Sequence, residues 1–144
     1  MSRLKSIAFA IKERIEEIDE LAGAVVVYNP SSIESEFERR MGKLKGKLAV
    51  VRLTTAKNTS RNKTSARFSG TYTVSLFTTP ILNQKDAKDS DDLMDEIVEK
   101  LHGWWPESIP SNGIVWADAD TLTYQDDPQF DVTVLKLECP RQTP

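Results

Sequence analysis

The chain has one cysteine, one histidine and no long hydrophobic run, and each shortage excludes a class of protein. The lone Cys139 cannot form a disulfide within the chain, so a disulfide-stapled scaffold is excluded. The longest apolar run, around Ala22–Tyr28, is far shorter than the ~20 residues of a membrane span. Met1–Lys5 is followed by helical periodicity interrupted by charges, which is not typical of a secretory signal. We therefore expect synthesis in the cytoplasm and no membrane partner.

Motifs that carry chemistry are also scarce. His102 and Cys139 have no family signature around them and do not indicate a nucleophile–base pair. The chain contains no CxxC, HExxH or glycine-rich phosphate loop. Asp118 and Asp120 fall on one strand face without the spacing of a calcium loop, and we interpret them as solvated. We predict that the protein is not an enzyme and that it has no catalytic residue, cofactor or metal.

The hydrophobic residues, 39 % of the 144, suit a single domain over residues 1–144 with a real core. The expected elements are a helix over Leu4–Ile18, a strand over Ala24–Tyr28, a helix over Ile33–Leu44, a strand over Leu48–Thr54, a strand from Phe68 to Leu76, a helix over Asp91–Leu101, and strands over Ile114–Tyr124 and Phe130–Glu138. The order α-β-α-β-β-α-β-β predicts an α+β fold, in which the helices pack on one face of a mostly antiparallel sheet.

Three local patterns give finer expectations. Ser31 and Glu34 have the spacing of a capping box at the start of the second helix. The polar segment Thr55–Ala66 lacks periodicity, which favours a mobile loop or a hairpin tip. The last strand changes its apolar face between Val134 and Leu135, which predicts a bulge there.

The charges are strongly divided along the chain. The segment Arg39–Arg67 holds ten of the 19 lysines and arginines and none of the 22 acids. The rest of the chain is therefore strongly acidic, most densely at Asp86–Glu99, where seven acids accompany one lysine. Such a distribution of charge selects partners and steers association.

Three interpretations of the basic segment remain open. It could contact nucleic acid through phosphates, although no aromatic residue that could stack on bases lies within Arg39–Arg67. It could be a solvated, mobile loop. It could also contact the acidic stretch Asp86–Glu99 of an identical neighbour in a head-to-tail ring. We favour an assembly surface, with a small nucleic-acid-binding domain as the alternative.

The candidate interface residues are cations, acids and one aromatic. Trp104 and Trp105 follow the third predicted helix, and we expect one of them to pack in the core and the other to anchor a partner. The full set is Lys57, Arg61, Lys63, Arg67, Asp91, Asp92, Asp95 and Trp105.

The order of elements resembles that of the tail terminator, or tail-completion, proteins of tailed bacteriophages, especially those of Mu-like prophages. The residues that carry the resemblance are the alternating strand Tyr72–Leu76, its end Phe77-Thr78-Thr79-Pro80, and the acidic-started helix Asp91–Gly103 with the strands that follow. At the level of element order the resemblance covers most of the chain.

The resemblance implies a structural role in the virion. Such proteins form hexameric rings on the end of the tail tube, stop its polymerisation and join it to the head or neck. The implied partners are other copies of the chain, the tube and sheath proteins, and a head-completion or neck protein; DNA enters only by passing through the lumen. The implied location is the host bacterial cytoplasm during assembly and then the virion tail.

Overall fold

The computed structural model describes residues 3–41, 46–58, 68–79, 90–104, 118–125 and 130–139. Its elements are α1 (Arg3–Ile15), the short 3-10 helix η1 (Asp19–Leu21), β1 (Val25–Val27), α2 (Ile33–Met41), β2 (Lys47–Asn58), β3 (Phe68–Thr78), α3 (Ser90–Leu101), β4 (Asp118–Gln125) and β5 (Asp131–Cys139). The fold is α+β, as predicted, and the predicted order is confirmed apart from η1. None of the helices described has the length and apolar character to cross a membrane.

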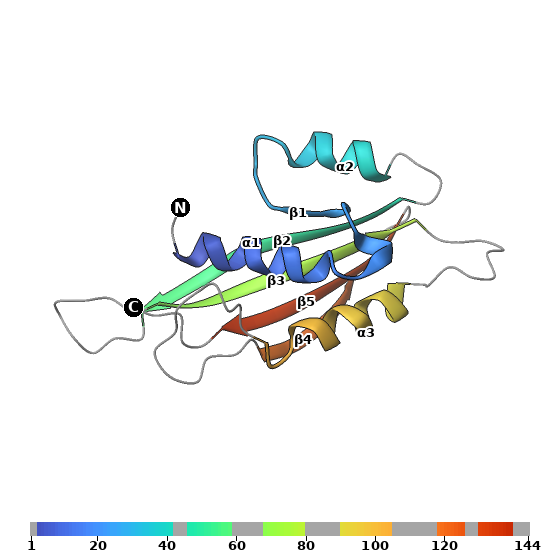
Figure 1. Ribbon diagram of the computed structural model, residues 1–144. Helices are drawn as coiled ribbons and strands as arrows, with labels where there is room; N and C mark the ends of the chain where they lie inside the picture. Colours follow the sequence, from blue (N-terminus) through green and yellow to red (C-terminus); the bar gives the residue numbers. More distant parts are fainter. Residues whose placement is uncertain are drawn as a thin grey trace.

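A single five-stranded sheet organises the molecule (Figure 1). Its spatial order is β1-β2-β3-β5-β4, which makes β1 and β4 the edge strands. Among the described strands, only β1 and β2 are parallel, whereas the other three pairings are antiparallel. The prediction of a mostly antiparallel sheet is therefore confirmed.

The main core lies between one face of the sheet and the helices α1 and α3 (Figure 1). The predicted alternation of β3 is confirmed, since Tyr72, Val74 and Leu76 are fully buried on this face. The helix α1 contributes an apolar stripe with i, i+4 spacing, including the buried residues Ile7 and Ile11. These side chains fix both helices against the centre of the sheet.

The helix α2 lies on the opposite face, which corrects the prediction that all helices share one face. Successive side chains of a strand point to opposite faces, so Leu48 and Val50 of β2 face away from the main core and pack with Met41 of α2. Phe37 of α2 completes this second cluster through edge-to-face contacts with Phe77 at 5.2 Å and Phe130 at 5.3 Å. The sequence showed apolar residues on both faces of β2 but not which helix covers each face.

The strand β2 continues four residues beyond its predicted end, to Asn58. Its pairing with β3 persists past a bulge at Thr54, whose hydroxyl donates to the carbonyl oxygen of Thr71 at 3.0 Å. Residues 55–58, predicted as loop, are therefore strand, because pairing with β3 overrides their polar composition. The rest of the predicted loop lies outside the described residues.

Two other local predictions are wrong. At the start of α2, the Ser31 side chain does not form the predicted capping box; its hydroxyl and its N–H both donate to the side-chain oxygen of Asn29, at 2.8 and 3.0 Å. The strand β5 pairs with β3 in unbroken register through Val134 and Leu135, so no bulge occurs there. The irregularity is in β4 instead, at Asp120.

We expect the two phenylalanines Phe37 and Phe9 to differ in their contribution to stability. Phe37→Ala removes both aromatic contacts of the second cluster and should lower the free energy of unfolding by about 2–4 kcal/mol. Phe9→Ala is the matched control, because Phe9 is exposed and its loss should cost less than ~1 kcal/mol. Urea unfolding followed by circular dichroism measures both values. Equal losses for the two variants would contradict the role given to Phe37.

Candidate assembly surface

The three predicted interface acids lie on the exposed side of α3. Asp91 and Asp92 occupy its first turn, where carboxylates interact favourably with the positive end of the helix. Asp95 and Glu99 follow Asp91 at four-residue intervals, so Asp91, Asp95 and Glu99 form one exposed line along the helix. We call these three residues the acidic stripe. Like charges at this spacing slightly destabilise a helix. A contribution to the stability of α3 therefore does not explain why acids occupy these positions.

Lys57, the described member of the predicted basic group, lies at the far end of β2. It is exposed and stands next to the last residue of the strand. Lys47 at the opposite end pairs with Thr78, where β3 ends. At ~3.3 Å per residue, Lys57 is about 30 Å from Lys47 along the strand.

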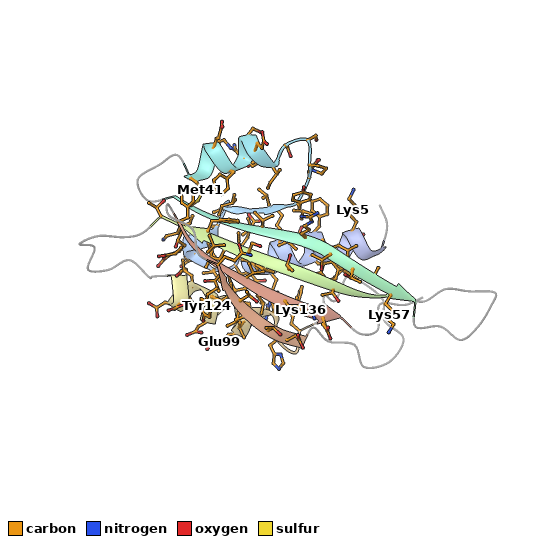
Figure 2. The ribbon with its side chains drawn as sticks, turned by 180° about the vertical axis from the view of Figure 1, so that it is seen from behind. Lys5, Met41, Lys57, Glu99, Tyr124 and Lys136 are labelled. Atoms are coloured by element: carbon orange, nitrogen blue, oxygen red, sulfur yellow. The ribbon has the colours of Figure 1, made fainter. Side chains whose placement is uncertain are left out.

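The cation Lys57 and the start of the acidic stripe therefore lie toward opposite ends of the sheet. The first turn of α3 is at the end where β2 begins, whereas β2 ends at the other extremity (Figure 1). Lys57 and Glu99, the last acid of the stripe, are also well separated (Figure 2). Charges this far apart are largely screened, because the Debye length is only ~8 Å at physiological salt. A contact between Lys57 and the acidic stripe within one chain is thus excluded.

Within the described part of the chain, the acidic stripe and Lys57 are distinguished by having no charge partner. Ion pairs of the described residues include Lys12–Glu16, Arg14–Glu17, Lys100–Glu17, Lys47–Glu20, Arg39–Glu36, Lys136–Asp120 and Lys136–Glu138. Within the described part of the chain, neither Lys57 nor any acid of the stripe takes part in one. These four charges are thus available to another molecule.

Other cations of the basic segment serve the fold. Arg39 pairs with Glu36 at 2.7 Å, and Lys47 pairs with Glu20 at 2.7 Å. The guanidinium of Arg52 lies over the ring of Tyr28, the residue that follows β1, at 4.1 Å from the ring centroid. Counting charges along the sequence therefore overestimated the number of unpaired cations. A pair such as Lys47–Glu20 cannot be seen in the sequence, because its two residues lie far apart along the chain.

Four predicted interface residues, Arg61, Lys63, Arg67 and Trp105, lie outside the described residues. The neighbouring Trp104 is half-buried against the main core, and the guanidinium of Arg14 lies 5.4 Å from its ring centroid. The expectation that one tryptophan of the pair packs in the core is therefore confirmed.

No pattern in the sequence indicated the contact between the end of α3 and β4 or the polar cluster beside it. His102, just after α3, accepts a hydrogen bond at Nδ1 from the N–H of Ala119 at 3.1 Å. At the adjoining bulge, the carboxylate of Asp120 accepts a 2.7 Å hydrogen bond from the hydroxyl of Thr121 and lies 3.6 Å from the ammonium of Lys136. The Thr121 hydroxyl, with Lys136 contributing, lowers the pKa of Asp120 below its ordinary value. The hydrogen bond of His102 holds the end of α3 against the edge strand β4, and the contacts of Asp120 join β4 to β5.

Comparison with known proteins identifies no family for this chain. No protein-family model matches it, and no curated protein matches it.

We predict that Thr121→Val raises the pKa of Asp120 toward that of an ordinary aspartate. A lowered folded-state pKa gives a stabilisation that is complete above the unfolded value of ~3.9 and is lost as the pH falls through the folded value. The variant should therefore lose less stability than the wild type on acidification below about pH 4. Carboxyl-carbon NMR titration measures the pKa. Thr123→Val, on the same strand, is the control, and identical Asp120 titrations in Thr121→Val and wild type would contradict the prediction.

Proposed function

We propose that this protein is a structural assembly protein, not an enzyme, that forms a ring and caps the tail tube of a bacteriophage or prophage, as the tail terminators that it resembles do. The observation that carries the proposal is the position of its charges. Lys57 and the acidic stripe lie toward opposite ends of one sheet, and in the described part of the chain neither has a partner. Each end therefore offers a contact to another molecule.

The partners follow from the same proposal. In a cyclic ring all copies have the same orientation, so equivalent surfaces repeat around the axis. One face of a hexameric ring would bind the last ring of tube protein, together with the sheath protein where a sheath is present. The other face would bind a head-completion or neck protein and would not accept more tube. DNA would only pass through the lumen, in virions assembled in the host bacterial cytoplasm.

The proposal is tested by reversing the charges at each end. Native mass spectrometry and analytical ultracentrifugation should show oligomers of the wild type that weaken as salt is raised. Asp95→Lys should weaken each contact by about two- to five-fold, as expected for an exposed ion pair. Adding Lys57→Glu to the same chain should restore part of the loss, because the exchanged charges again attract.

The control for this experiment is Glu13→Lys, which makes the same charge change at an exposed position of α1. It should leave association unchanged. A wild-type protein that stays monomeric at all concentrations and salt conditions would overturn the proposal, as would electron micrographs without rings. Retention on DNA that is lost when Lys57, Arg61, Lys63 and Arg67 are all replaced by Ala would instead favour the nucleic-acid-binding alternative.

A further inference from the structure

The exposed apolar surface is concentrated at the two edges of the sheet. Among the described residues, three large hydrophobic side chains are exposed: Phe9 by 38 %, Leu122 by 37 % and Tyr124 by 66 %. Phe9 projects from α1 beside β1, whereas Leu122 and Tyr124 belong to β4. Because β1 and β4 are the edge strands, a contact between the two edges of neighbouring copies would cover all three side chains.

The edge of β1 presents backbone groups that can pair with another strand. The carbonyl of Ala24 and the N–H of Tyr28 bond to β2 at 2.9 and 2.8 Å. Backbone groups of successive residues in a strand alternate in direction, so those of Val25 and Val27 point away from β2. Within the described residues this edge has no partner strand, and such an edge is a template for an added strand.

A groove of about 640 Å³ follows this edge between α1 and α2. Its α1 wall carries Phe9 and Lys12, and its α2 wall carries Ile33 and Glu36. These walls belong to opposite faces of the sheet, since α1 packs on the main core and α2 on the second cluster. A strand seated in the groove would therefore meet an aromatic residue on one side and a mixed polar wall on the other.

The strand β4 has the matching alternation. Leu122 pairs with the buried Leu135, so Leu122 and Tyr124 project on the face of the sheet that carries α1 and α3. The alternate residues Thr123 and Gln125 project on the other face. In a strand docked in the groove, the apolar set would face Phe9 on the α1 wall and the polar set would face the mixed α2 wall of Ile33 and Glu36.

We propose that β4 of one copy pairs with β1 of the next, so that the sheet continues from subunit to subunit. Both β1 and β5 run antiparallel to β3, and β4 runs antiparallel to β5, so β4 and β1 have opposite directions. In copies of the same orientation, as a ring requires, the two edges therefore pair antiparallel. Leu122 and Tyr124 then cover Phe9, while Thr123 faces the wall formed by α2.

This inference rests on the proposed self-assembly and gives the charged ends a separate task. If the edges join the subunits side by side, the Lys57 ends of all copies lie on one rim of the ring. The first turns of α3, with Asp91, lie toward the other rim. The edges then close the ring, and the rims of unlike charge bind what lies above and below it, which in the isolated protein is another copy of the ring.

The test blocks one edge at a time. Phe9→Glu places a charge in the β1 groove, and the double change Leu122→Lys with Tyr124→Lys places charges on β4; all three positions are exposed, so folding should be retained. Each variant alone should lose side-by-side assembly by ~30-fold or more, because an unpaired charge is buried at the contact. An equimolar mixture should recover association through the two intact edges, and it can extend beyond a heterodimer because the Glu and Lys of the two altered edges attract each other.

The controls are Ala22→Glu and Ala22→Lys, which add the same charges at an exposed position that neither lines the β1 groove nor belongs to β4, and both should assemble like the wild type. Native mass spectrometry measures the species, and circular dichroism verifies folding. Wild-type rings with unaffected edge variants would overturn this inference and leave the proposed function standing. A Phe9→Glu variant that forms dimers alone would also overturn it, because that result indicates pairing between two β4 edges. A monomeric wild type would overturn both proposals.

Discussion

The alternation of side chains along the long β2–β3 pair is the constraint on which the rest of the structure depends. Ala49 and Val51 of β2 point into the main core beneath α1, and Leu48 and Val50 point into the second cluster beneath α2. A shift of register by one residue would exchange the two sets and leave both helices without their contacts. The two clusters are therefore coupled through one strand. Burial on both sides fixes the register more firmly than burial on one side would.

That constraint also explains how much of the fold the sequence could predict. The helices α1 and α3 and the strand β3 were predictable because each has one periodic apolar set, as in the alternation Tyr72–Leu76. The face of the sheet that α2 covers could not be predicted, because Phe37 packs against Phe77 and Phe130, which are far away in the chain. Periodicity shows that a face is apolar and says nothing about what covers it. The extension of β2 to Asn58 likewise depends on its pairing with β3.

Part of the candidate assembly surface could also be predicted from the sequence, and part could not. The acidic stripe was predictable because three acids spaced four apart fall on one side of any helix. The cations of the basic segment that have no ion-pair partner could not be predicted, because pairs such as Lys47–Glu20 join residues that only the fold brings together. The exposure of Phe9, Leu122 and Tyr124 depends on where the sheet ends. The strand order determines which strands are edges, and no local sequence pattern predicts the order β1-β2-β3-β5-β4.

The separation of charge along the strands has a kinetic consequence as well. With Lys57 toward one end and the acidic stripe toward the other, these charges contribute an electric dipole that lies roughly along the sheet. In the field of a second molecule, such a dipole experiences a torque and turns before any surfaces touch. Fewer encounters then begin in a wrong orientation, so productive collisions become more frequent. Added salt shortens the range of that torque and slows association, even where the apolar contacts of the final complex are unchanged.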